Sequence, residues 1–285
     1  MALDFKESVV SLSITTIRPF LDHPFEIRDD ESMKETVQSV KEYGVIMPVI
    51  VRPTVDGGYE MISGHRRMRA CVLAGIDTIP AIIRDVDRDA AIIMMVDSNL
   101  QRENILPSER AKAYKMKLDA IKRQGQRNDL TSTQIAQKLS VEKVAEEAGT
   151  SKDNVRRYIR LNELSPSLQK LVDEQKMGLT PAVEISYLKP EEQALLVETI
   201  ESEQATPSLS QAKRMRELSK LGKLNDDRIL DIMLEQKKPT SNNIVLPADK
   251  VDQYFPKSYT TEQKVTTIFR VLEIWQKRMQ QKQNR

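Results

Sequence analysis

The chain has 285 residues, of which 39% are hydrophobic and 30% charged, and its formal net charge is +2. This composition supplies enough apolar side chains for packed cores and excludes a chain disordered throughout, while the length suggests two or three domains at about 100–200 residues each. One cysteine, Cys71, excludes an internal disulfide framework, and only two histidines, His23 and His65, argue against a structural zinc site.

The sequence offers no segment for a membrane. No stretch approaches the ~20 apolar residues that a spanning helix needs. The first ten residues include charged side chains, such as Asp4 and Lys6, and lack the apolar core of a signal peptide. We therefore expect a soluble, cytoplasmic protein.

The near-neutral total hides an uneven distribution of charge. Residues 1–101 carry a net −5, residues 102–165 a net +5 and residues 166–285 a net +2. A basic segment attracts phosphate backbones, although solvated helix faces would give the same pattern.

Residues 1–104 alternate between the patterns of strands and helices. Helical spacing places Met33, Val37 and Val40 on one face, and Gly44 ends that helix. Strands are predicted at 9–17, 49–51, 59–62 and 81–83, and helices at 30–43, 66–73 and 89–99. The pattern predicts a small α/β domain.

The sequence from Pro107 onward is predicted to be helical almost throughout. Helices are expected at 108–124, 132–139, 141–148, 152–162, 166–175, 181–187, 190–203 and 208–220, with a break at 125–129. A strand at 243–246 and a final helix from about residue 261 follow. The predicted fold class is α+β: an α/β domain (1–104), an all-α helical domain (105–221) and a mostly helical C-terminal region (222–285).

The final helix carries one apolar stripe, formed by Val265, Ile268, Phe269, Leu272, Trp275 and Met279. Such a stripe indicates a dimer interface. Packing of the helix on its own domain is the alternative.

The strongest single motif is a helix-turn-helix at about 141–161. Ala145 is small where two helices would cross closely, and Gly149 can adopt a positive φ in the turn between them. Ser140 and Ser151 stand at the expected N-cap positions. The shared apolar seam is predicted to consist of Val144, Ala148, Val155 and Tyr158.

The second helix of this motif is rich in basic and polar side chains. In a helix-turn-helix, the N-terminal part of that helix enters the major groove, where arginines pair with guanine edges or phosphates. The candidate DNA-binding residues are Ser151, Lys152, Asp153, Asn154, Arg156, Arg157 and Arg160. A helical hairpin with a charged face is the alternative interpretation.

Two polar boxes in the α/β domain indicate an anion site. Ser63–Ala70 follows a predicted strand and begins a predicted helix. At this position a glycine, the free backbone N–H groups of the first helical turn and two adjacent guanidiniums suit a polyphosphate. The second box, Asn99–Asn104, offers Asn99 as a magnesium or phosphate partner and Glu103 as a partner of the first-box arginines. A basic first turn without a ligand and a polar hinge are the corresponding alternatives.

In this order, ahead of a helix-turn-helix, the boxes resemble the ParB family of DNA-partition proteins. The family's first box reads roughly Gly-Glu-Arg-Arg-x-Arg-Ala, and here it is Gly64–Ala70. Its second reads Glu-Asn-Leu-Gln-Arg-Glu-x-Leu-x-Pro-x-Glu-x-Ala, and here it is Ser98–Ala111. Gly44–Arg52 is similar to its Gly-Ile-x-x-Pro-x-x-Val-Arg stretch, and Arg160–Leu164 to the segment after its recognition helix. The resemblance covers roughly residues 8–205.

The resemblance implies a dimeric DNA clamp that depends on CTP and Mg²⁺. Such a protein loads at a palindromic site on double-stranded DNA, is nucleoid-associated, and works with a ParA-like partner ATPase. Gly44 and Pro48 would shape the base pocket, and Asn99 would help to place the metal. The nucleotide-binding residues implied by the motifs are Gly44, Pro48, Gly64, His65, Arg66, Arg67, Asn99, Arg102 and Glu103.

Two departures from the family pattern affect the expected chemistry. His65 replaces the glutamate of the first box, and Ser98 replaces the glutamate that opens the second. That second glutamate is associated with CTP turnover, and a serine lacks the charge to assist a metal or orient water. We therefore expect at most a weak CTPase.

Two other functions fit parts of the sequence. Ser63–Arg66 faintly resembles the Gly-Cys-His-Arg motif of sulfiredoxin, whose fold is related, but the nucleophilic cysteine is absent and Cys71 is expected to be a buried structural thiol. A nucleotide-independent transcription regulator of a plasmid or mobile element would use the same DNA-binding helices.

Overall fold

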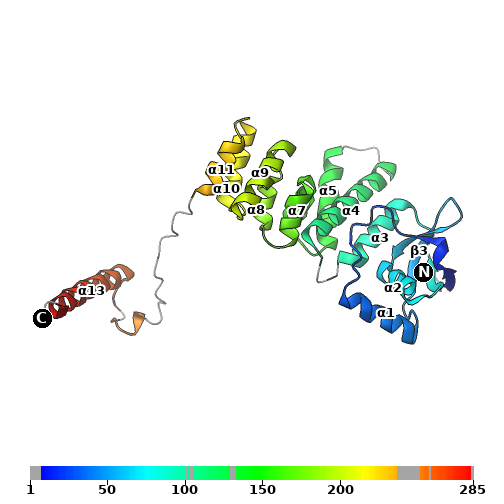
Figure 1. The fold of residues 1–285 in the computed structure, drawn as a ribbon, viewed down its shortest axis with the longest axis horizontal. Coiled ribbons are helices and arrows are strands. Elements are labelled where there is room, and N and C mark those ends of the chain that lie inside the picture. The colour runs from blue at the N-terminus through cyan, green and yellow to red at the C-terminus, as the bar shows by residue number, and fades with distance from the viewer. Residues whose placement is uncertain are drawn as a thin grey trace. The chain divides into compact units, whose positions relative to one another are not determined.

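The computed structural model describes residues 8–100, 102, 105–128, 133–235, 251–256 and 258–283 (Figure 1). The chain divides into two compact units, Met1–Leu234 and Glu235–Arg285. The predicted fold class is confirmed, because a small sheet with helices is followed by helices alone in the described part of the chain.

The sheet has the strand order β1-β5-β3-β4-β2. Its strands are β1 (Val9–Ser13), β2 (Ile17–Arg18), β3 (Val49–Pro53), β4 (Tyr59–Ser63) and β5 (Thr78–Ile83). The single strand predicted at 9–17 is wrong. β1 pairs antiparallel with β5 at one edge, whereas β2 pairs parallel with β4 at the other. The 3-10 helix η1 (Ile14–Thr16) joins them.

Three helices cover this sheet: α1 (Glu31–Tyr43), α2 (His65–Ala74) and α3 (Arg88–Leu100). Successive side chains of a strand point to opposite faces. Met61 of β4 accordingly packs in a core with α1 and α2, and Ile62 packs in a second core with α3. Cys71 is buried in the first core, as predicted, and burial raises the pKa of its thiol.

The helical domain begins with the long helix α4 (Pro107–Asn128). The following elements are α5 (Thr133–Glu147), α6 (Lys152–Arg160), η2 (Leu161–Glu163), α7 (Pro166–Asp173), α8 (Leu179–Ile185), α9 (Pro190–Glu203), α10 (Leu209–Lys220) and α11 (Asp226–Leu234). α11 has no counterpart in the sequence analysis. Its Ile229 and Ile232 are buried in the same core as Leu196 and Met215.

Two predicted breaks are absent from the described helices. α4 continues through Gly125 to Asn128, and α5 is one helix in which Ser140 is an interior, buried residue rather than an N-cap. A glycine inside a helix costs about 1 kcal/mol, which packing of the flanking turns can offset. No proline or glycine lies near Ser140 to end the helix there.

The second unit contains α13 (Thr261–Gln283), which begins at the predicted residue. Val265, Phe269 and Trp275 of its apolar stripe are exposed, at 47%, 63% and 60%, whereas Ile268 is partly buried. The strand predicted at 243–246 lies outside the described residues. Among the helices that are described, none is long and apolar enough to cross a membrane.

Candidate nucleotide and DNA sites

The turn that enters α2 requires glycine. Gly64 has φ +108°, and a Cβ built on it would lie 2.5 Å from Cγ1 of Val49 in β3. Any other residue would combine a strained backbone with a clash. The helix starts at His65, and no described side chain caps its first N–H groups. Unpaired N–H groups and the positive end of the helix dipole favour an anion at this turn.

Arg67 links this turn to the loop before β3. Its NH1 group donates to the carbonyl oxygens of Met47 at 2.5 Å and Pro48 at 2.7 Å. Gly44, with φ +71°, ends α1 and begins the same loop. The structure therefore brings the predicted base-binding stretch into contact with the predicted phosphate-binding box.

Two more guanidinium groups add positive charge. Arg66 donates to Oγ of Ser32 at 3.0 Å and lies 3.7 Å from the carboxylate of Asp30. Burial and then the charge of Arg102 lower the pKa of Arg67, while desolvation and then the charge of Arg66 lower the pKa of Arg102. Arg102 is thus repelled by both Arg66 and Arg67, and a polyanion placed among the three would offset that repulsion.

A pair of imidazoles, the buried His65 and the partly buried His23, lies beside the cations. The ring centroids of His65 and His23 are 3.9 Å apart. Nε2 of His65 accepts a 3.4 Å hydrogen bond from the backbone N–H of Phe20, and His23 bonds through Nδ1 to the carbonyl oxygen of Phe25 at 2.6 Å. Burial, His23 and Arg102, in that order, lower the pKa of His65 to about 3. The residue that replaces the family's glutamate is therefore uncharged at neutral pH.

Asn99 is buried near the end of α3. Its Nδ2 donates to the carbonyl oxygen of Met95 at 2.7 Å and to Oγ of Ser98 at 3.3 Å, and the Ser98 hydroxyl itself donates to Met95 at 2.9 Å. Because the amide nitrogen is engaged within the helix, the amide oxygen is the atom that a cation would use. One such oxygen fits Mg²⁺, which takes few protein ligands besides phosphates and waters. Glu103 lies outside the described residues.

The helix-turn-helix consists of α5, a turn and α6. Gly149 has φ +61° in the turn, and Oγ of Ser151 accepts a 3.1 Å bond from the N–H of Asn154, so the predicted turn and cap are confirmed. Val144 and Val155 are buried. They pack against α4 in one core formed by Tyr114, Leu118, Val141, Val144, Ala145 and Val155.

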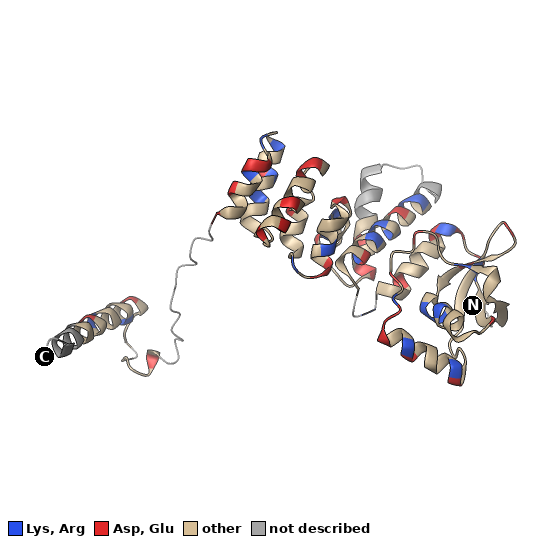
Figure 2. Cartoon of the chain, viewed as in Figure 1, with Lys and Arg blue, Asp and Glu red and all other residues tan. Residues whose placement is uncertain are grey.

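The candidate DNA-binding side chains fall into two groups. Ser151, Lys152, Asp153 and Arg156 are exposed, whereas Asn154, Arg157 and Arg160 are partly buried. The exposed cations have weak local partners, since Arg156 lies 3.4 Å from Asp153 and Lys152 lies 3.3 Å from Glu142. Figure 2 shows further Lys and Arg residues along the neighbouring α4.

The partly buried arginines attach α6 to α8. Arg157 donates to Oγ1 of Thr180. Arg160 donates to Oγ of Ser186 at 3.1 Å and to its carbonyl oxygen at 2.7 Å. The Arg160 guanidinium also lies 4.1 Å from the ring centre of Tyr187. Arg160 therefore has a structural role that the sequence pattern did not indicate.

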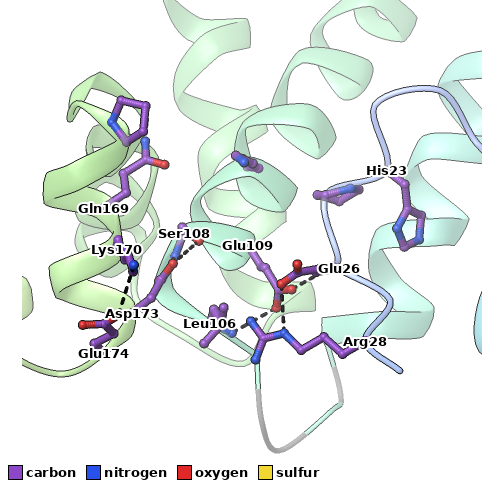
Figure 3. Close-up of a pocket in the computed structure, with 13 residues that line it drawn as sticks. His23, Glu26, Arg28, Leu106, Ser108, Glu109, Gln169, Lys170, Asp173 and Glu174 are labelled. Carbon is purple, nitrogen blue, oxygen red and sulfur yellow. Dashed lines mark hydrogen bonds and ion pairs between the residues drawn. The ribbon is translucent and has the colours of Figure 1, made fainter. Parts of the chain in front are cut away.

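A cavity of about 780 Å³ lies where the loop of residues 23–28 meets α4 and α7 (Figure 3). Ser108 donates from its N–H at 2.9 Å and its hydroxyl at 2.6 Å to the carboxylate of Asp173. Glu109 accepts from the N–H of Glu26 at 2.8 Å. These bonds fix the start of α4, immediately after the second box. Sequence analysis missed them because their partners are distant in the chain.

The comparisons with known proteins agree with this arrangement. The chain matches the ParB N-terminal domain family over residues 3–100 and the ParB HTH domain family over residues 103–220. It is 31% identical over 218 residues to the probable chromosome-partitioning protein ParB of Coxiella burnetii, covering 76% of this chain and 67% of that protein. The chain spans between 56% and 67% of the length of the first curated relatives that it matches.

Among the solved structures that are similar to this chain are two of ParB proteins. A pNOB8-like ParB N-domain is 17% identical with a TM-score of 0.50, covers 79% of this chain and 94% of that chain, and supports the fold alone. The ParB of Caulobacter crescentus complexed with CTP-γ-S is 25% identical with a TM-score of 0.32, covering 68% of this chain and 98% of that chain. With both family models matched in order and a relative above 30% identity covered over two thirds of its length, this chain belongs to the ParB family of DNA-partition proteins.

Proposed function

We propose that this protein is a site-specific DNA-binding partition protein that acts as a CTP-dependent dimeric clamp. One observation carries the nucleotide part of the proposal. Beside the uncapped N-terminus of α2, burial and then the charge of Arg102 lower the pKa of Arg67, and burial and then the charge of Arg66 lower the pKa of Arg102. A site with several guanidiniums beside the N-terminus of a helix is suited to a triphosphate.

The loop of residues 44–48 supplies the second half of this proposed site. Ile46 is 78% exposed and Met47 is 69% exposed, so their side chains are available to cover a flat base. Arg67 holds the carbonyl groups of this loop next to the phosphate-binding turn. Magnesium would neutralise phosphate charge, with Asn99 as its protein ligand.

The DNA part of the proposal rests on α6. Its N-terminus is capped by Ser151, and Lys152 and Arg156 are exposed on it. Because a palindromic site is read by a symmetric protein, the clamp would be a homodimer. A ParA-like ATPase would be its partner, and the complex would be associated with the nucleoid.

Calorimetric titration with CTP and Mg²⁺ tests the nucleotide site. We expect wild type to bind CTP in preference to other nucleoside triphosphates. Arg67→Ala should weaken binding about tenfold or more, since a charge-assisted bond contributes ~1.5–3 kcal/mol. Arg69→Ala is the matched control, because Arg69 lies on the same helix but pairs with Asp29 at 2.5 Å.

Three outcomes distinguish the proposed nucleotide site from its alternatives. Loss of binding in Arg67→Ala alone supports the proposed site. Equal losses of CTP affinity in Arg67→Ala and Arg69→Ala would show that binding depends on the positive charge of α2 and not on a specific site. If wild type gives no heat with CTP, Mg²⁺ and DNA present, a nucleotide-independent DNA-binding regulator is the better description.

A further inference from the structure

Lys117 of α4 is fully buried, with 0% of its side chain exposed. A buried ammonium is stable only when it is paired and hydrogen-bonded. Its Nζ lies 2.6 Å from a carboxylate oxygen of Glu147 and also donates to Asp97. The two carboxylates come from different helices, α5 and α3, so one ammonium joins three helices.

The position of Lys117 on α4 explains this arrangement. Ala113, Met116 and Ala120 recur at helical spacing and pack in the core that contains α3. Tyr114 and Leu118 face the core of the helix-turn-helix. Lys117 lies between these two faces on the helix, at the boundary between the cores. Leu100, at the end of α3, packs against both.

Each acid is adjacent in sequence to a candidate site. Asp97 precedes Asn99 by two residues, and Glu147 precedes Gly149 of the helix-turn-helix by two. We propose that Lys117 is a positioning residue that couples the orientation of α3, and with it the Asn99 end of the nucleotide site, to the orientation of the helix-turn-helix. For its nucleotide end, this proposal rests on the proposed function.

The coupling follows from the difference in exposure between the ammonium of Lys117 and its two carboxylate partners. Asp97 and Glu147 have side chains 44% and 36% exposed, so water can solvate either of them if it is released. The ammonium has no such exposure. If α3 and α5 move apart, it remains buried and loses one of its two carboxylate partners. The two helices therefore move together, or the contact breaks as a discrete event. A change at one site is in this way transmitted to the other.

Hydrogen exchange on the full chain tests the coupling. Lys117→Met would remove the contacts to both acids at once, so Glu147→Gln, which alters only the contact with α5, is the informative variant. Glu146→Gln is the matched control, because it removes the same charge from the neighbouring exposed position of α5. Without nucleotide, Glu147→Gln should speed amide exchange in residues 93–100 of α3 by about fivefold or more, the lower end of couplings between sites. Glu146→Gln should not.

The second measurement adds CTP-γ-S and Mg²⁺. In wild type and Glu146→Gln, the nucleotide should change amide exchange in residues 141–160. In Glu147→Gln this change should be lost, although calorimetry still detects binding of the nucleotide. Equal exchange in Glu147→Gln and Glu146→Gln without nucleotide would overturn the proposal. Absence of CTP binding in wild type would contradict the proposed function instead, and the nucleotide-free measurement would still decide the role of Lys117.

Discussion

At the scale of single residues, His65 makes stability depend on pH. The unfolded histidine gains a proton near pH 6.5, whereas burial, His23 and Arg102 hold the pKa of the folded residue at about 3. Between these values the unfolded state binds more protons, so stability falls as the pH falls, by at most about 1.4 kcal/mol per pH unit. Above pH 6.5 the effect is absent.

We expect His65→Gln to reduce this dependence, because the amide does not titrate. Urea unfolding at pH 7.5 and pH 5 would measure it in both proteins. His23 should contribute in the same direction, since burial is the main cause that lowers its pKa too. The same loss of stability on acidification in wild type and His65→Gln would mean that His65 is not responsible.

A second prediction at this scale concerns turnover. Ser98 is exposed on α3 and its hydroxyl is bonded to the carbonyl of Met95 in the same helix. A carboxylate at this position would lie next to Asn99 and could orient water or a metal. Ser98→Glu should therefore raise the rate of phosphate release from CTP above that of wild type. Ser98→Gln, of similar size but without charge, should not.

At the scale of secondary-structure elements, α6 divides into a DNA-contacting part and a packing part. Replacing Lys152 and Arg156, the exposed cations of α6, with Ala should abolish site-specific binding and lower the salt dependence by about two units, roughly one for each phosphate contact. Binding to duplex DNA over a salt series would measure this. Unchanged affinity and slope would refute the assignment of α6 as the recognition helix.

Arg160→Ala is expected to behave differently. Its bonds to Ser186 and its contact with Tyr187 hold α6 against α8. Losing them should reduce the free energy of unfolding by about 1–3 kcal/mol. A thermal unfolding scan would detect this, and a normal melting temperature together with lost DNA binding would indicate direct readout by Arg160 instead.

At this scale, the sequence predicted features that depend on residues close together in the chain. Gly44, Gly149 and Ser151 were identified because a positive φ or an N-cap is determined by a few neighbouring residues. The division of residues 9–17 into β1 and β2 was missed because their partners, β5 and β4, are distant in the chain. For the same reason, no sequence pattern indicated a role for Lys117, whose partners Asp97 and Glu147 lie on α3 and α5.

The candidate sites show the same limit. The motifs predicted which residues belong to the candidate nucleotide site, but not that Arg67 bonds to the loop of Met47 and Pro48 or that the ring of His65 lies against that of His23. These contacts join residues about 20 and 42 positions apart, and neither pairing leaves a periodic signal.

At the scale of the whole molecule, α4 connects the structural parts of the first unit. One side of it packs with α3 against the sheet, and another packs with the helix-turn-helix. The hydrogen bonds of Ser108 to Asp173 and of Glu26 to Glu109 fix its beginning to α7 and to the loop before α1 (Figure 3). A displacement of α4 would therefore alter the structure of both proposed sites. A clamp that responds to nucleotide requires such a connection.

The last prediction concerns self-association through the second unit. Val265, Phe269, Leu272 and Trp275 recur every three or four residues along α13 and are 47–63% exposed. This spacing is typical of a helix that pairs with a second copy, since apolar residues on one stripe are buried when two such helices meet. We expect the full chain to sediment as a dimer and a chain ending at Thr260 to sediment as a monomer.

Substitutions in the full chain separate loss of the interface from loss of the segment. Phe269→Asp places a charge on the stripe and should dissociate the dimer, whereas Thr266→Asp, on an exposed polar position of α13, should not. Fluorescence of Trp275, the only tryptophan in the chain, should change with protein concentration in wild type and in Thr266→Asp. A truncated chain that still forms dimers would place the interface within residues 1–260, and α13 would then need another role.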